Sequence, residues 1–181
     1  MPAIQVRPVL PADLPHLIAF DHTSFSDHVW QMEIQELQKE IGVFFRERRL
    51  PRTVQIDYPR DPRNLADSWD QNSGLLVAVL QGSAEIPVGY VNLIDGPHRA
   101  VVHIRDLVVA REQRRKGIGT ALLLAAQEWT LHHGASELLL ETLSRNYPAI
   151  CLAKKLGFEF CGYSDHYYAN REIALFFGKS L

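Results

Sequence analysis

Residues 111–120 combine basic side chains with two glycines one residue apart, and an apolar segment with helical spacing follows them. Gly117 and Gly119 let the backbone bend tightly and leave the N–H groups of residues 116–120 uncovered by side chains. Free N–H groups and the positive end of the helix dipole favour an anion at a helix N-terminus, and the basic side chains add positive charge. The turn therefore predicts a pyrophosphate-binding site. Its candidate residues are Arg114, Arg115, Lys116, Gly117, Ile118, Gly119 and Thr120.

Spacing separates this turn from two other nucleotide-binding motifs. A Walker A loop needs four residues between its glycines and then Gly-Lys-Ser/Thr, whereas one residue separates Gly117 from Gly119. A dinucleotide fingerprint needs Gly or Ala three residues beyond the second glycine, where this chain has Leu122. An ordinary strand-to-helix turn with an exposed charged flank is the alternative that these residues alone leave open.

A second motif lies C-terminal to the glycine turn. The first has the pattern Arg/Gln-x-x-Gly-x-Gly at residues 114–119 and comes after a predicted strand, VVHIRDLVV. The second keeps the register of Asn-x-x-Ala-x-x-x-Tyr-x-Lys-x-Gly-Phe, with Asn146, Ala149, Lys155, Gly157 and Phe158. Together, at this separation and with matching strands and helices, the two motifs resemble those of the GCN5-related N-acetyltransferase (GNAT) family. The resemblance covers roughly the whole chain.

The resemblance implies an α/β (α+β) fold, with helices on both faces of a mixed, mostly antiparallel sheet of about seven strands. In the splay between the fourth and fifth strands of that fold, Leu107, Val108 and Val109 would bind acetyl-CoA, and backbone groups of Leu107 and Val109 would pair with its pantetheine arm. Amides 115–120 would bind its pyrophosphate. Asn146 would hydrogen-bond the pantetheine or steady the base of the splay, although it is equally a good helix cap.

Acetyl transfer to an amine requires a proton acceptor. A lysine-like amine with a pKa near 10.4 is neutral in only about one molecule in a thousand at pH 7, so the site must remove a proton. Asp106, beside the cofactor-binding strand residues, and Glu141, at the end of LLLE, are the acids best placed to accept it directly or through water. Either could instead pair with Arg105 or Arg145 at the surface. A backbone N–H near Val109 would hold the developing oxyanion.

One position departs from the family's pattern. Where the family often has a tyrosine that protonates the departing thiolate, this sequence has Ala153. A thiolate with a pKa of about 8.5 leaves without much help near neutral pH, so the loss is tolerable, or another phenol serves. The candidate phenols are Tyr147, Tyr163, Tyr167 and Tyr168. Tyr147 joins Asp106 and Glu141 as a catalytic candidate.

Acceptor residues are suggested by a looser similarity to streptothricin acetyltransferases. It lies in DHVWQM, RRLPR, YPRDP, NYPAI, FCGYSDHYYAN and ALFF. A small cationic acceptor with a primary amine would suit Asp27, Glu33, Asp165 and Trp30 as partners, although exposed acids and a core tryptophan are the plainer interpretation of each. Two alternatives remain, a protein N-terminal or lysine acetyltransferase and a non-catalytic acetyl-CoA-binding module. A homodimer, common in the family, is compatible with the sequence.

Length and composition predict one soluble domain over residues 1–181. The chain is 46% hydrophobic and 22% charged, and no apolar run approaches the roughly 18 residues of a membrane span. Its formal net charge of −2 gives no general attraction to nucleic acid. The N-terminus lacks signal-peptide features, and Cys151 and Cys161 lack metal or redox spacing, which predicts a cytoplasmic protein. The eight histidines lack ligand spacing as well, so no metal is expected.

Several elements must position these residues. Residues 22–40 resemble a loop entering a helix, whereas 41–50 alternate as a strand with one wet face. Residues 51–74, with three prolines, predict a long surface connection. Gly89 predicts a bulge. The remaining predicted elements are strands at 4–9, 74–81, 88–95, 100–109, 136–143, 159–169 and 172–178, and helices at 14–20, 118–133 and 147–156.

Overall fold

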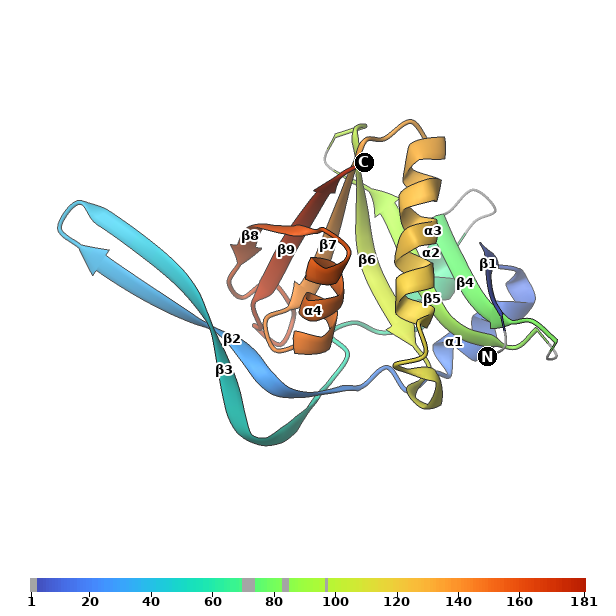
Figure 1. Cartoon of the computed structure of the whole chain (residues 1–181), viewed down its shortest axis with the longest axis horizontal. Helices are drawn as coiled ribbons and strands as arrows, with labels where there is room; N and C mark the ends of the chain where they lie inside the picture. The colour runs from blue at the N-terminus through green and yellow to red at the C-terminus, as the bar shows by residue number, and fades with distance from the viewer. Residues whose placement is uncertain (1–2, 70–73, 83–84, 97) are drawn as a thin grey trace.

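The computed structural model describes residues 3–69, 74–82, 85–96 and 98–181. Seven strands form the main sheet: β1 (Ile4–Pro8), β4 (Gly74–Leu80), β5 (Pro87–Asp95), β6 (Val101–Val109), β7 (Glu137–Leu143), β8 (Glu159–Ser164) and β9 (Ala174–Ser180). Their order is β1-β4-β5-β6-β7-β9-β8 (Figure 1). Neighbouring strands are antiparallel except β6 and β7, which are parallel. The predicted mixed, mostly antiparallel sheet is confirmed.

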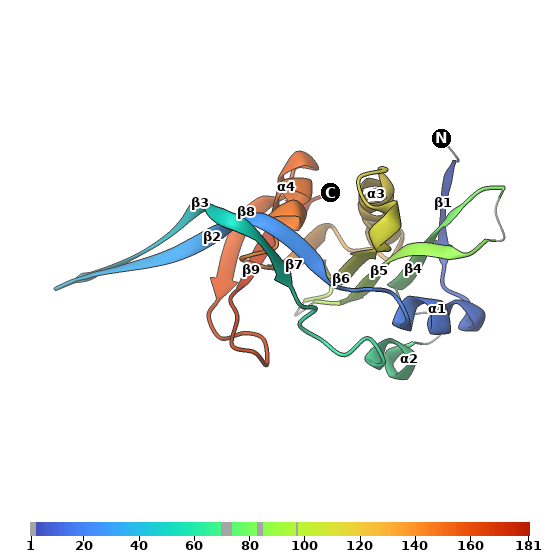
Figure 2. The same cartoon turned by 90° about the horizontal axis from the view of Figure 1, so that it is seen from below.

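Helices cover both faces of this sheet, as predicted (Figure 2). α3 (Ile118–His132) and α4 (Tyr147–Lys155) lie on one face, and the short helices α1 (Leu14–Ile18) and α2 (Asn64–Ser68) lie on the other. Two 3-10 turns, Pro11–Asp13 and Arg111–Gln113, precede α1 and α3.

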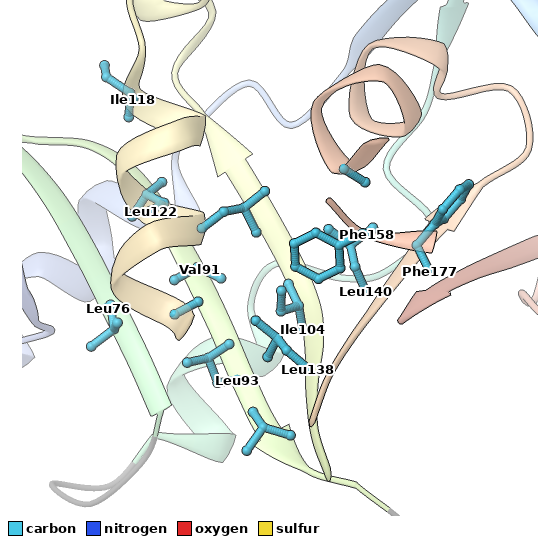
Figure 3. Close-up of a cluster of buried hydrophobic side chains, with 14 of the residues drawn as sticks. Leu76, Val91, Leu93, Ile104, Ile118, Leu122, Leu138, Leu140, Phe158 and Phe177 are labelled. Carbon is cyan, nitrogen blue, oxygen red and sulfur yellow. The ribbon is translucent and has the colours of Figure 1, made fainter. Parts of the chain in front are cut away.

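The main core lies between α3 and the sheet (Figure 3). Leu122, Leu123 and Ala126 lie on one face of the helix and are fully buried. They belong to the same packed cluster as Val91 and Ile104 of the sheet. A second cluster, with the aromatic side chains of the α1 and α2 region packed against it, contains Val9, Leu17, Leu65, Leu75, Val77, Val79, Tyr90 and Val108.

β6 and β7 stay paired over only part of their length. Their parallel ladder ends where Ile104 lies opposite Leu140. Beyond that point β6 continues to Val109 and β7 to Leu143, with no further pairing between them in the described residues. The two strands therefore splay apart, as the family resemblance implies, and one backbone edge of residues 105–109 is left without a strand partner.

Gly89 lies at a bulge, which confirms the prediction. The register between β4 and β5 shifts between Ala78 and Val79. A Cβ atom on Gly89 would lie 2.9 Å from the carbonyl oxygen of Val108, a distance that a real side chain cannot keep. Glycine therefore allows the close approach of β5 and β6 beside the splay.

A long two-stranded ribbon extends away from the sheet (Figure 1). It consists of β2 (Ser24–Leu37) and β3 (Glu40–Ile56), which pair antiparallel. The helix expected within residues 22–40 is therefore wrong. The surface connection expected at 51–74 is wrong in part, because its first residues complete β3 and α2 lies within it; residues 70–73 lie outside the described residues.

Apolar and polar side chains alternate along β2, and the prediction of a helix overlooked this pattern. Trp30, Met32 and Ile34 share one face of β2, and the polar residues between them share the other, which is the period of a strand. Near the sheet, Trp30 and Phe45 both pack against Phe160 of β8. This long-range packing, which local sequence does not reveal, favours the strand over a helix.

Candidate active site

A cavity of about 900 Å³ opens at the splay between β6 and β7. Its wall is made by the ends of these strands, the start of α3, part of α4 and residues 56–60 at the end of β3. The volume is in the range of small-molecule sites, roughly 300–1,000 Å³. One cavity thus brings together the glycine turn and both predicted acids.

The glycine turn forms the N-terminus of α3. Gly117 has a φ of +88°, which L residues rarely adopt, and nothing lies within 4 Å of the place where its Cβ would be. No side chain of the described residues caps this end of the helix. The first N–H groups, those of residues 118–120, have no partner within the helix and belong to residues that line the cavity. The turn is therefore an open row of donors.

Most of the predicted pyrophosphate residues reach the cavity. Its wall includes Arg114, Arg115, Gly117, Ile118, Gly119 and Thr120. Lys116 does not line it; its Nζ lies 3.0 Å from the side-chain oxygen of Gln113 instead. The structure therefore does not place the Lys116 side chain where the sequence predicted.

Arg114 is tied to the protein backbone. Its Nε donates to the Val109 carbonyl at 3.0 Å, and its Nη2 donates to the Asp21 carbonyl at 3.2 Å. The Ala110 N–H donates to Val88 of β5, so by strand alternation the backbone groups of Leu107 and Val109 face the splay. The Val109 N–H and both groups of Leu107 fit the predicted pairing with an added strand. The Val109 carbonyl does not, because Arg114 occupies it.

Asn146 both caps a helix and lines the cavity. It is the N-cap of α4, and its side-chain oxygen accepts from the Ala149 N–H at 3.4 Å. It also belongs to the cavity wall, with Leu107, Val108 and Val109. The two interpretations of Asn146 that the sequence left open are therefore compatible.

The two predicted acids meet at one arginine. Asp106 lies just beyond the β6–β7 ladder on β6, Glu141 lies at the same level on β7, and both are buried. Arg60 bridges them, with Nη1 3.4 Å from Oδ1 of Asp106 and Nη2 bonded directly to Oε1 of Glu141. The alternative pairing of these acids with Arg105 or Arg145 is not what the structure shows. Arg60 instead donates to the carbonyl of Arg105.

Glu141 is surrounded by donors. The Tyr167 hydroxyl donates to its Oε2 at 3.0 Å, Nε2 of His103 lies 3.3 Å from the same oxygen, and Tyr168 also hydrogen-bonds the carboxylate. Burial alone would raise the pKa of Glu141. The contacts with His103 and Arg60 outweigh burial and lower the pKa to about 2. Glu141 is therefore a fixed negative charge at neutral pH.

Asp106 has a different set of partners. The Tyr58 hydroxyl donates directly to its Oδ1, and Nδ2 of Asn92 donates to its Oδ2 at 2.9 Å. Only 3% of the Asp106 side chain is exposed, yet it belongs to the cavity wall, as does Tyr58. Access to this carboxylate is thus narrow and lies beside the Tyr58 hydroxyl.

The site also contains residues that the sequence analysis missed. Tyr58 and Arg60 come from the segment predicted as a surface connection, and His22 lines the same cavity. One signal was available for Arg60. Two carboxylates predicted at the buried ends of central strands require a cation nearby, but the sequence alone does not show which arginine supplies it.

The candidate tyrosines Tyr147 and Tyr168 differ in their position relative to the cavity. Tyr147 does not line the cavity; its hydroxyl donates to Glu47 of the ribbon at 2.9 Å, and its ring stacks on His28. Tyr168 is buried and lines the cavity. Ala153, at the position of the family's tyrosine, is fully buried. The geometry therefore does not favour a catalytic role for Tyr147.

None of the four acceptor candidates on the ribbon and the β8 side lines the cavity. Asp27 pairs with His28 beside it, and Asp165 pairs with His166 beside it. Glu33 is held on the ribbon by two arginines. Trp30 packs against the core and lies under the Lys154 ammonium, 5.0 Å from it. The plainer interpretation of these residues is the one that the structure supports.

The described residues contain no group of three or more His, Cys, Asp or Glu side chains that could hold a metal ion. In the same residues, every helix is too short or too polar to cross a membrane.

Comparison with known proteins decides the family. Residues 34–158 match the model of the acetyltransferase (GNAT) family, which is more than half of the 181-residue chain. The chain belongs to the GNAT family. Its similarity to a crystal structure of nourseothricin acetyltransferase, with a TM-score of 0.80 and 25% identity over 98% of both chains, confirms the GNAT fold.

Two GNAT relatives differ in the acceptors that their names imply. The chain is 44% identical to an N-alpha-acetyltransferase of Sulfurisphaera tokodaii over 73 residues, which cover 40% of this chain and 44% of that protein. It is 32% identical to a streptothricin acetyltransferase of Streptomyces lavendulae over 108 residues, which cover 60% of this chain and 56% of that protein. The chain thus spans about half the length of these curated relatives.

Proposed function

We propose that this GNAT protein is an acetyl-CoA-dependent N-acetyltransferase that acts on a primary amine of a small cationic acceptor of the streptothricin class. The observation that carries the proposal is the shared cavity, which joins the uncapped glycine turn to the buried group Asp106–Arg60–Glu141. An anion site and a proton-accepting carboxylate are what acetyl transfer to an amine requires. The relatives named streptothricin and nourseothricin acetyltransferases support the acceptor class.

The cavity residues fit acetyl-CoA. The free N–H groups of residues 118–120 and the Arg115 guanidinium would hold the pyrophosphate. Leu107 would pair with the pantetheine arm, and Asn146, which is also on the cavity wall, would lie beside that arm. When bound, acetyl-CoA supplies the acetyl group as a thioester.

Asp106 is the proposed proton acceptor. Asp106, Glu141 and Arg60 carry two negative charges and one positive charge, so these three groups leave one net negative charge that attracts an ammonium group. Glu141, with a pKa of about 2, is too weak a base to compete for the amine proton. Its role is to position Arg60 and to contribute charge.

The remaining steps need few side chains. The Val109 N–H faces the splay and would stabilise an oxyanion there. Burial, with the nearby charge of Glu141, raises the pKa of Tyr168 far above its ordinary value. Transfer of its proton to a thiolate with a pKa of about 8.5 is therefore unfavourable. The proposed mechanism accordingly has no phenol acid, in agreement with Ala153 at the family's tyrosine position.

The direct test is thiol release from acetyl-CoA by the purified chain with streptothricin, simple polyamines and short peptides in parallel. Release with streptothricin is expected, and a Gly117→Glu variant should abolish it by blocking the anion site. Release with peptides alone would overturn the acceptor class and favour the protein acetyltransferase named among the relatives. A melting temperature raised by acetyl-CoA without release from any acceptor would indicate a non-catalytic binding module.

A further inference from the structure

A row of two tyrosines and a histidine leads away from Asp106, and the proposed mechanism does not use these side chains. The Tyr58 hydroxyl donates to Oδ1 of Asp106, and the Tyr90 hydroxyl is its neighbour. The Tyr90 hydroxyl lies 3.1 Å from Nε2 of His22. Four side chains distant in the sequence thus lie in one row, with a direct hydrogen bond at each of its two ends.

The path is buried in its middle and open at two places. Tyr90 is fully buried, and Asp106 is nearly so. Tyr58 and His22 are both partly exposed and line the cavity. A proton could therefore enter beside Tyr58 and leave at His22 without bulk water reaching the residues between them.

The tautomer of His22 suits the end of such a path. Its Nδ1 lies 2.7 Å from the carbonyl oxygen of Phe20. Because a carbonyl only accepts hydrogen bonds, Nδ1 carries the proton in the neutral ring, and the lone pair is on Nε2 facing Tyr90. The ring is thus oriented to accept a proton from the Tyr90 hydroxyl.

The charged groups around His22 agree with this role. They are Asp106 and Asp21, which favour its protonated form, and Arg114, which opposes it. Burial is the largest effect and lowers the pKa of His22 below its ordinary value, so the ring is neutral at pH 7.

We propose that Tyr58, Tyr90 and His22 form a relay that moves the proton of the acceptor amine to Asp106 and then to His22. First, the amine N–H bond breaks as its proton joins the Tyr58 oxygen, while the original Tyr58 proton passes to Oδ1 of Asp106. Next, that proton returns to Tyr58, Tyr58 passes one to Tyr90, and Tyr90 passes one to Nε2 of His22. The amine has lost one proton, His22 has gained one, and Asp106 is again a carboxylate. His22 then releases the proton to water.

This relay rests on the proposed function, and its test uses the whole chain with acetyl-CoA and streptothricin. We would measure kcat/KM for streptothricin from about pH 6 to about pH 10 for the wild type and for Tyr58→Phe, Tyr90→Phe and His22→Ala. Tyr163→Phe is the matched control, because Tyr163 lies on β8 and does not line the cavity. Melting temperatures would show that each variant is folded.

The expected losses depend on pH. Tyr58→Phe should lower kcat/KM about 100-fold near pH 7, and Tyr90→Phe and His22→Ala about tenfold, because proton transfer by a positioned group contributes at least that much. The losses should shrink toward high pH, where more of the amine is already neutral. Added imidazole should restore the activity of His22→Ala in proportion to the concentration of neutral imidazole.

The outcomes separate the two proposals. No turnover by the wild type with any acceptor overturns the proposed function and the relay with it. Wild-type turnover together with variants that match Tyr163→Phe overturns the relay alone. A loss that is equal at every pH and is not restored by imidazole assigns these side chains a purely structural role, and also overturns it.

Discussion

At the scale of single residues, Arg60 holds two carboxylates that the fold removes from water. It lies between Asp106 and Glu141, and only 17% of its side chain is exposed. Such a pair is costly to bury, but it is more costly to break, because an unpaired charge is left behind. Arg60 therefore stabilises the fold, and it also neutralises one of the two negative charges that Asp106 and Glu141 bring to the cavity.

Replacement of Arg60 tests this dual role. We expect Arg60→Met to lower the free energy of unfolding by about 3–5 kcal/mol, since Asp106 and Glu141 lose their shared cation. Arg63→Met is the control, because the Arg63–Asp61 pair is largely exposed and its loss should leave the denaturation midpoint nearly unchanged. Chemical denaturation measures both, and equal effects would contradict the assignment.

Glu141 predicts a dependence of stability on pH. Its folded pKa of about 2 lies below its ordinary value of 4.5, so ionised Glu141 stabilises the fold above about pH 4.5. That contribution is lost as the pH falls from 4.5 towards 2. We expect Glu141→Gln to lower Tm at pH 7 by roughly 5 °C. The difference from the wild type should narrow below pH 4 in thermal unfolding; a constant difference would contradict the low pKa.

Replacing Gly117 should weaken CoA binding by more than backbone strain alone explains. An L residue at its φ of +88° costs about 1–2 kcal/mol, so Gly117→Ala should be destabilised and should bind CoA at least tenfold more weakly, because the donor row shifts. Gly134→Ala is matched, with a φ of +75° and equally open surroundings, but it lies at the far end of α3. Titration calorimetry should show unchanged CoA affinity for this control.

The sequence predicts some of these residues and not others for a physical reason. Asp106 and Glu141 lie next to recognisable strand and glycine motifs, so short-range pattern is enough to place them. Tyr58 and Arg60 reach the site only because β3 crosses back from the ribbon to the open edge of β6. Such a return depends on contacts between segments far apart in the sequence, such as those of Arg60 with Arg105 and Glu141, which no local period encodes.

At the scale of elements, the ribbon is predicted only in part: the strand at 41–50 lies within β3, whereas β2 was expected to contain a helix. One face carries the Glu33–Arg46 and Glu33–Arg48 ion pairs, and the other carries the apolar residues that pack on β8 near the sheet. An isolated hairpin is marginally stable in water, so its base depends on the body for its conformation. Its outer part makes no such contact in the described residues.

Shortening the ribbon tests this division. Met32 lies opposite Phe45, so residues 33–44 can be replaced by Asn-Gly, which forms a two-residue hairpin turn. The described cavity wall includes no residue from 33–44. We therefore expect CoA affinity within about twofold of the wild type and a Tm within about 4 °C, by calorimetry and thermal unfolding. Loss of CoA binding would show that the outer ribbon supports the site.

At the scale of the whole molecule, the outer ribbon also offers apolar area for the homodimer with which the sequence is compatible. Ile34 and Ile41 share its apolar face and are 59% and 71% exposed. We expect concentration-dependent association in sedimentation velocity that is lost in the double variant Ile34→Glu, Ile41→Glu. Leu131→Glu, at a similarly exposed site on α3, should associate like the wild type. A wild type that is monomeric at all concentrations would contradict the homodimer.

The short β6–β7 ladder has a consequence for how the chain opens and folds. β1, β4, β5 and β6 all come from residues 4–109, and β7, β8 and β9 from residues 137–180, so each half of the sheet is continuous in sequence. The β6–β7 ladder joins the halves through four residue pairs, and the main buried cluster contains side chains from both halves. Units that are contiguous in sequence are those that can open separately from the native state, and here such opening would have to break the ladder and this shared packing. A ligand in the splay would touch both halves, so its binding energy would also couple their opening and make hydrogen exchange in the two halves cooperative.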